Sequence, residues 1–257
     1  MVKSSRDVQL DLALLTLGLG VAAAPFLFLV PVPARAAWPY LAGTIVIHVG
    51  YYVAIVNAYR AGDLSHGYPI MRGLAPLLVA LSATAWFGET PGPALWAGVI
   101  LICGGVLSLG LVGFHWRESR ASTGWALANA VIIAAYTLVD AAGARASGSP
   151  LSYVVWLFVL DALPFPLMVY LARRAALVEY AARHWVRGLV GGALSAVAYA
   201  IALWAMTRAP VAAVAALRET SVIFAALIGA WLLKEGHVVR RLASALVVVA
   251  GVVALKL

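Results

Sequence analysis

Long apolar runs separated by short polar breaks are the main pattern of this chain. Most runs have about 20 residues, the length that an α-helix needs to cross the hydrocarbon core of a bilayer. The breaks carry proline, glycine and charged residues, which commonly end helices. The pattern predicts nine membrane-spanning helices, at about 8–30, 37–59, 66–87, 91–112, 122–141, 151–172, 186–207, 210–233 and 237–256.

The composition indicates that this fold lies in a lipid bilayer. Of the 257 residues, 64% are hydrophobic and 11% are charged, whereas about a quarter of the residues of a soluble domain are charged. The first run follows Lys3 and Arg6 and could be a cleaved signal, but it is longer than a usual signal-peptide core. Only the stretch 173–187 is polar enough for a small amphipathic surface segment. We therefore expect an all-α integral membrane protein.

Charge and cysteine content exclude several classes of function. The formal net charge of +8 is attributed to loops on the cytoplasmic face, so no nucleic acid is expected as a partner. The single cysteine, Cys103, allows no intramolecular disulfide and no cysteine-rich metal site. The five histidines lack paired spacing, so neither a metal nor another cofactor is expected.

Two stretches of the chain match each other at a constant offset. Arg72 aligns with Arg218, Glu89 with Glu235 and Gly105 with Gly251. Each copy has an apolar run with one arginine near its start, a glutamate at the next break, and a second apolar run. Such matching over about fifty residues indicates internal duplication, and duplicated helical units in membranes are typical of transporters.

Several of these segments resemble a known family. Residues 51–52 (YY), 58–65 (AYRAGDLS), 68–77 (YPIMRGLAPL) and 88–89 (GE), together with 209–211, 217–221 and 234–235 in the second copy, resemble the EamA-type transporters of the drug/metabolite transporter superfamily. The resemblance covers nearly the whole chain and indicates the superfamily, not the solute.

The resemblance implies ten helices in two inverted five-helix repeats around a central cavity, which exchange small organic solutes by alternating access. Here the first repeat, 1–113, is expected to hold four helices and the second, 114–257, five. Either the true start lies upstream or the chain is a nine-helix variant. Related small multidrug transporters carry a proton-coupling acidic residue in their first helix, and that role has no counterpart here. The charge distribution places the loop at 117–120 inside, the family layout places it outside, and the orientation stays open.

Five ionisable residues lie well inside apolar runs: Arg72, Asp140, Asp161, Arg218 and Glu219. Each costs roughly 2.5–3.5 kcal/mol near mid-membrane, so such groups face a cavity or a partner. Arg72, with Tyr68 one turn before it, and Arg218 are candidates for binding an anionic group of the solute, since a guanidinium matches a carboxylate or phosphate bidentately. The alternative is a structural ion pair of either arginine with Asp140, Asp161 or Glu219. Glu219 could couple transport to protons or form an internal pair with an arginine.

Other polar residues fall on common helix faces. Tyr136 lies one turn before Asp140, Trp156 lies near Asp161, and His48 lies one turn before Tyr52. These residues could line the solute pocket or simply form hydrogen bonds between helices. His48 is either a packing residue or a proton relay.

These observations lead to one main hypothesis and two alternatives. We expect a multi-pass transporter of the bacterial inner membrane that moves a small organic solute, which can be anionic, and that is not an enzyme. A non-transporting membrane subunit is the first alternative, and an enzyme acting on lipid, for which no nucleophile or metal cluster is found, is the second. Small residues such as Gly98, Gly105 and Gly251 offer close contacts between the repeats or in a homodimer.

Overall fold

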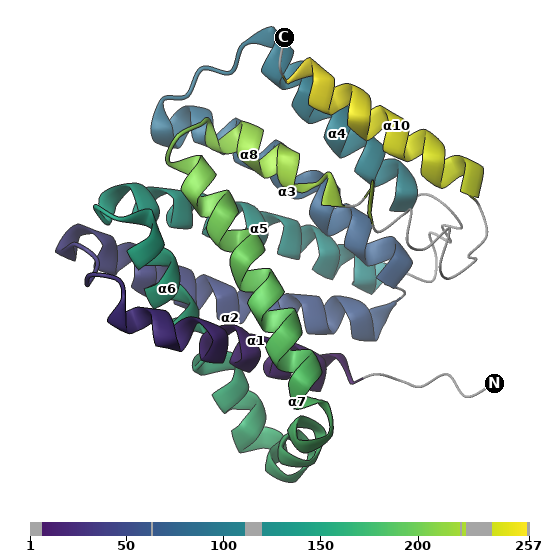
Figure 1. Ribbon diagram of the computed structural model, residues 1–257. Helices are drawn as coiled ribbons and strands as arrows, with labels where there is room; N and C mark the ends of the chain where they lie inside the picture. Colours follow the sequence, from purple (N-terminus) through teal and green to yellow (C-terminus); the bar gives the residue numbers. More distant parts are fainter. Residues whose placement is uncertain (1–6, 63, 111–119, 222, 225–237, 256–257) are drawn as a thin grey trace. The chain divides into compact units, whose positions relative to one another are not determined.

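The computed structural model describes residues 7–62, 64–110, 120–221, 223–224 and 238–255. Within these ranges the secondary structure consists of helices, and no strand occurs (Figure 1). Glu235, the residue that aligns with Glu89, and residues 117–119 of the predicted loop lie outside the described residues. The helices are α1 (Val8–Ala23), η1 (Ala24–Phe28), η2 (Arg35–Ala37), α2 (Trp38–Ala61), α3 (Leu64–Phe87), α4 (Pro93–Gly110), α5 (Arg120–Ala146), α6 (Pro150–Asp161), α7 (Pro164–Met206), α8 (Val211–Arg218) and α10 (Val238–Ala254).

Five helical stretches of the described residues are long and apolar enough to cross a membrane. Shorter apolar helices cover Pro93–Leu109 and Leu242–Ala254. The all-helical membrane fold is therefore confirmed, and the chain is a multi-pass membrane protein. The count of nine spanning helices stays a prediction, since much of the run 210–233 lies outside the described residues. The five stretches are Val8–Phe28, Arg35–Ala61, Gly67–Phe87, Arg120–Ala146 and Pro150–Met206.

Two predicted runs are interrupted in the structure. In the run 210–233, α8 ends at Arg218 and a turn follows it. The run predicted at 151–172 is interrupted, because α6 ends at Asp161 and α7 begins at Pro164. Proline lacks the backbone N–H needed inside a helix but fits its first turn, so Pro164 starts a new helix. Helix α7 then continues through the predicted surface segment 173–187, with a local departure from helical geometry at Arg173 (φ −145°, ψ 46°).

The chain divides into two compact units. Unit 1 comprises Met1–Val56 and Val139–Thr207, and unit 2 comprises Asn57–Leu138 and Arg208–Leu257. Helices α2 and α5 each contribute residues to both units. Compact units are defined by contacts, whereas the predicted repeats 1–113 and 114–257 are defined by duplication. The two divisions describe different properties, and the repeats stay a prediction.

In unit 1, glycines allow α1 to approach α7 closely (Figure 1). A Cβ atom on Gly18 would lie 2.0 Å from the backbone oxygen of Gly188, and one on Gly192 would lie 2.2 Å from the backbone nitrogen of Leu19. Gly188 and Gly192 are four residues apart, the spacing of small residues that lets membrane helices pack backbone to backbone. A core cluster that includes Phe165 buries side chains from the same helices.

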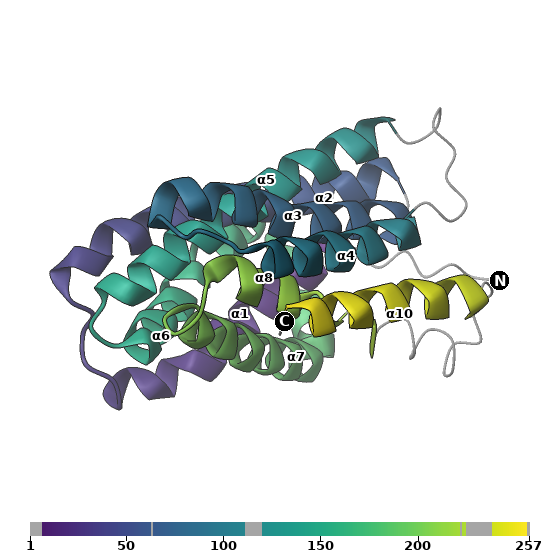
Figure 2. The same ribbon diagram turned by 90° about the horizontal axis from the view of Figure 1, so that it is seen from above.

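In unit 2, α4 packs against both α3 and α10, and α4 and α10 run side by side in Figures 1 and 2. A Cβ on Gly98 or Gly105 would collide with atoms of α10, and one on Gly251 would collide with Ile102 of α4. The hydroxyls of Ser108 and Ser244 are 2.7 Å apart between these helices. The matched glycines Gly105 and Gly251 therefore serve helix packing inside one unit.

Asp7 caps the N-terminus of α1 and ties it to α7. Its side chain accepts hydrogen bonds from the backbone N–H groups of Gln9 and Leu10, at 3.2 and 3.3 Å. Arg173 Nη2 lies 2.6 Å from its second oxygen. Burial raises the pKa of the Asp7 carboxyl, but the hydrogen bonds from Arg173 and the two amides together lower this pKa below its ordinary value of 3.8.

Replacing Asp7 with alanine is expected to cost about 1 kcal/mol, the usual effect of losing a charged N-cap. Because the pKa of Asp7 is depressed in the folded protein, its contribution is complete above the unfolded value and is lost as the pH falls through the folded pKa. Thermal unfolding in detergent, from pH 6 down to pH 3, measures this loss. Ser149→Ala is the control, since Ser149 caps α6 through an uncharged hydroxyl and its effect should not depend on pH. A constant difference between Asp7→Ala and wild type over this range would contradict the prediction.

Candidate functional site

In unit 2, Arg72 forms a buried ion pair with Glu219. Arg72 lies on α3 between Pro69 and Pro76, and Glu219 follows the last residue of α8. Arg72 Nε is 3.0 Å from Glu219 Oε2, and both atoms are shielded from solvent. The pair satisfies one of the alternatives that the sequence left open for Arg72, and it places a guanidinium at an apolar helix contact.

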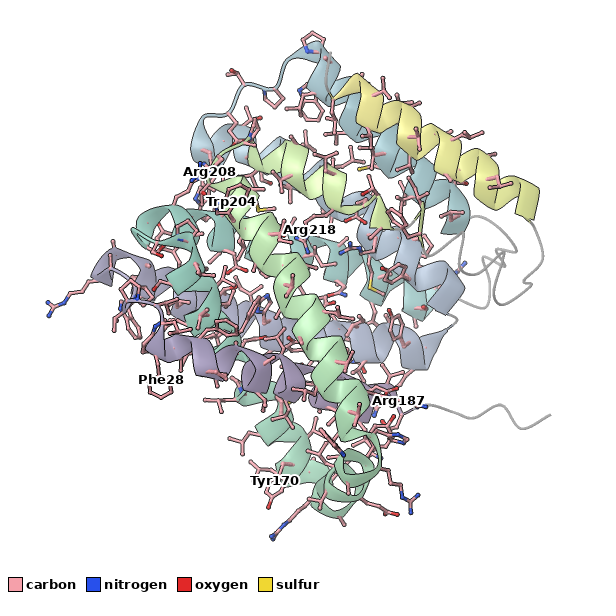
Figure 3. The ribbon with its side chains drawn as sticks, viewed as in Figure 1. Phe28, Tyr170, Arg187, Trp204, Arg208 and Arg218 are labelled. Atoms are coloured by element: carbon pink, nitrogen blue, oxygen red, sulfur yellow. The ribbon has the colours of Figure 1, made fainter. Side chains whose placement is uncertain are left out.

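Helix α8 is fixed at its start by a second glutamate. Both carboxylate oxygens of Glu89, which precedes α4, accept a hydrogen bond from the backbone N–H of Val211 at 3.1 Å. The first N–H groups of a helix have no partner inside it, and the helix dipole favours an anion there. Glu89 thus has a structural role, because it anchors the short helix that ends at Arg218 (Figure 3).

The remaining predicted residues of unit 2 differ in how far they are buried. Tyr68 lies one turn before Arg72 on α3 and is 38% exposed. Tyr136 is buried on α5. Arg218 is half-buried and precedes Glu219 directly, so the side chains of these two residues leave the helix in different directions.

Asn129 is a further buried polar residue of unit 2. It is fully buried on α5, where its amide nitrogen lies 3.0 Å from the sulfur of Met71. Its carbonyl oxygen has no hydrogen-bond partner among the described residues. Met71 precedes Arg72, so a buried amide accompanies the ion pair in unit 2.

In unit 1, the carboxylate of Asp161 contacts the side chains of two residues of α2. His48 Nδ1 is 3.2 Å from Asp161 Oδ1, and the hydroxyl of Tyr52 donates to Asp161 Oδ2 at 2.8 Å. Asp161 is the last residue of α6, where the negative end of the helix dipole disfavours an anion. The imidazole and the phenol of α2, one turn apart, compensate for that position.

Asp140 forms a second buried carboxylate centre in the same unit. It lies on α5, is inaccessible to solvent, and accepts hydrogen bonds from the hydroxyls of Tyr153 at 3.0 Å and Tyr199 at 2.5 Å. His48 also interacts electrostatically with Asp140. Helices α2, α5, α6 and α7 therefore each contribute to one polar cluster, which consists of His48, Tyr52, Asp140, Tyr153, Asp161 and Tyr199.

Trp156 lies on α6 but is not part of these hydrogen bonds. Its ring packs edge-on against Trp38, with centroids 5.6 Å apart. Its indole nitrogen is buried and has no hydrogen-bond partner within the described ranges. The structure thus associates Trp156 with an aromatic contact at the start of α2.

The structure sorts the ten predicted site residues into two groups. Tyr68, Arg72, Tyr136, Arg218 and Glu219 belong to unit 2, whereas His48, Tyr52, Asp140, Trp156 and Asp161 belong to unit 1. Tyr199 is a member of the unit 1 cluster that the sequence analysis missed. A tyrosine hydroxyl inside the apolar run 186–207 was the available signal.

The comparisons with known proteins give both a family and a fold. The profile described as "EamA-like transporter family" matches residues 122–257, which is more than half of the chain. A solved protein structure, titled only as a crystal structure of a protein, aligns with 99% of this chain and 90% of its own, with a TM-score of 0.75. Its sequence identity of 20% shows the fold alone.

The family match agrees with the resemblance found in the sequence. It covers residues 122–257 of the second predicted repeat, including Arg218 and Glu219. The family is one of transporters and not of enzymes, which is consistent with the expected class of function. The chain is a membrane transporter that belongs to the EamA-like transporter family, and with it to the drug/metabolite transporter superfamily.

Proposed function

We propose that this protein carries a small organic solute across the bacterial inner membrane by alternating access. In this proposal the repeats 1–113 and 114–257 are inverted copies with nine spanning helices in all, and the protein can act as a homodimer. The ten predicted site residues line the solute path. The observation that carries the proposal is the buried Arg72–Glu219 pair, with Arg218 beside it.

Stability alone does not explain a buried guanidinium. Apolar residues of similar volume often stabilise a fold at least as well as a buried ion pair. In a transporter, such a pair can take part in binding the solute. An anionic group of the solute can compete with Glu219 for Arg72, and Arg218 adds a second positive charge near the same carboxylate. Among small solutes, this chemistry favours those with a carboxylate or phosphate group.

The test uses the full chain in proteoliposomes loaded with a uniformly ¹³C-labelled cell extract, with the released metabolites identified by mass spectrometry. We expect protein-dependent release of one or a few organic acids or phosphate esters. Arg72→Lys keeps the charge but loses the planar fork of donors. It should slow release about tenfold, the effect of losing one charge-assisted hydrogen bond.

Arg183→Lys provides the matched control, because Arg183 forms an exposed pair with Glu179 on α7 and its substitution should leave release unchanged. Protein-free liposomes set the background. If wild-type protein releases no labelled metabolite above that background, the proposed function is wrong.

A further inference from the structure

The polar cluster of unit 1 combines two buried carboxylates with one imidazole. We propose that Asp140, His48 and Asp161 form a proton-binding site, and that loading and release of protons there drives solute movement. The proposal rests on the proposed transport function for its coupling step, but proton binding itself can be measured without a solute. Neither the family match nor the solved structure assigns an ion to these residues.

The charge of the cluster is the first argument. Asp140 is inaccessible to solvent and Asp161 is 4% exposed. In the described part of the chain, no lysine or arginine forms an ion pair with either carboxylate, and His48 is the basic group beside them. With both aspartates ionised and His48 neutral, two negative charges would be uncompensated inside apolar helices. Each bound proton removes one of these charges, at a depth where a single charge costs roughly 2.5–3.5 kcal/mol.

The position of His48 is the second argument. Its Nδ1 contacts Asp161 at 3.2 Å, and it interacts electrostatically with Asp140. A proton taken from water on one side can rest as an imidazolium beside an ionised aspartate, or on the aspartate beside a neutral imidazole. The same proton is then released to water on the other side. No other bond forms or breaks, and histidine is the side chain best suited to exchange protons near neutral pH.

Thr44 supplies the third argument. It lies one turn before His48 on α2, is fully buried, and interacts with Asp140, although its hydroxyl has no hydrogen bond of normal geometry with any described residue. The ionised Asp140 already accepts from Tyr153 and Tyr199. The Thr44 hydroxyl can donate to the ionised Asp140 or accept a hydrogen bond from the protonated Asp140, so Asp140 can gain or lose a proton beside the same neighbour.

The groups that surround the site set its response to pH. In unit 1, α2 contributes Tyr51 and Tyr52, α6 contributes Tyr153, and α7 contributes Tyr199. Helix α1 adds the uncharged Thr16, which interacts with Tyr52. These neighbours are neutral hydroxyl groups near neutral pH, so the charge of the cluster is carried by the two aspartates and His48.

Infrared spectroscopy of the full chain in lipid nanodiscs tests proton binding directly. Difference spectra between pH 5 and pH 8 should show a carbonyl-stretch band of a protonated carboxylic acid that disappears as the pH rises. Asp140→Asn and Asp161→Asn should each remove or shift this band, and His48→Gln should displace its midpoint. Asp7→Asn, which alters a carboxylate at the edge of α1, should leave the band unchanged.

Transport assays in the same proteoliposomes distinguish proton coupling from solute exchange. With the metabolite found in the ¹³C-extract screen, wild type should accumulate it at least tenfold under an imposed pH gradient. Asp161→Asn should lose that accumulation, whereas wild type at equal pH should exchange the solute without accumulating it. Accumulation driven by a sodium gradient and not by a pH gradient would overturn the proposal.

The outcomes distinguish this inference from the proposed function. Exchange of a metabolite without any pH-dependent carboxyl band would overturn the proton site and leave the transporter intact. A titrating band that Asp140→Asn and Asp161→Asn remove, without transport of any metabolite, would support the proton site while the proposed function fails. If the variants do not fold, the wild-type band still decides, because its absence between pH 5 and pH 8 overturns the proposal and its presence supports it.

Discussion

Alanine in place of Gly192 is expected to lower the stability of the protein markedly, and leucine there to prevent α1 from packing on α7. A Cβ at this position would lie 2.2 Å from the backbone nitrogen of Leu19, 2.4 Å from the carbonyl carbon of Gly18 and 2.8 Å from the carbonyl oxygen of Leu15. All three atoms belong to the backbone of α1, so no side-chain rotation relieves the overlap. Over-packing of this kind typically costs 1–3 kcal/mol, and we expect about 3 kcal/mol for alanine.

Two other glycines serve as matched controls for this prediction. Gly191 precedes Gly192 on α7, and its Cβ would meet only the end of the Leu15 side chain at 2.9 Å. Gly104 on α4 has nothing within 4 Å, so alanine there should be neutral or slightly stabilising. Thermal unfolding in detergent should rank the variants Gly104→Ala, Gly191→Ala, Gly192→Ala and Gly192→Leu in order of falling stability. Equal melting of Gly192→Ala and wild type would mean that α1 and α7 do not approach this closely.

The positions of the helices could be predicted from the sequence because lipid imposes a simple rule. A segment of about 20 apolar residues must be helical to pair its backbone groups inside a bilayer. The apolar runs at 8–30, 37–59 and 122–141 accordingly fall on candidate spans of the structure. The break before Pro164 was missed because a single proline inside an apolar run can either kink a helix or start a new one.

The contacts between helices could not be predicted in the same way. His48 and Tyr52 share a helix face by spacing alone, but nothing in the spacing connects them with Asp161, more than one hundred residues later. Tyr199 reaches Asp140 from a further helix. The Arg72–Glu219 pair was among several pairings that the sequence allowed. Choosing among such pairings requires the packing of α3 on α8, which hydropathy does not encode.

Breaking the Arg72–Glu219 pair is expected to destabilise unit 2 more than breaking any exposed pair. Glu219→Ala removes the partner of a guanidinium whose Nε is shielded from solvent. Loss of one member of a buried pair costs 3–5 kcal/mol, and we expect about 3 kcal/mol because the Arg72 side chain is 20% exposed. Glu179→Ala is the control, since its pair with Arg183 is exposed on both sides and should contribute less than about 0.5 kcal/mol.

The double variant Arg72→Met/Glu219→Gln separates stability from transport. It removes the buried charge together with its partner, so it should recover most of the stability that Glu219→Ala loses. If the pair were only structural, this variant would also transport at the wild-type rate. We expect it to melt close to wild type in detergent but to release the metabolite at least tenfold more slowly in proteoliposomes. If Glu219→Ala instead melts no lower than Glu179→Ala, water reaches the pair. The free-energy cost of burying Arg72 is then too small to support a role for it in solute binding.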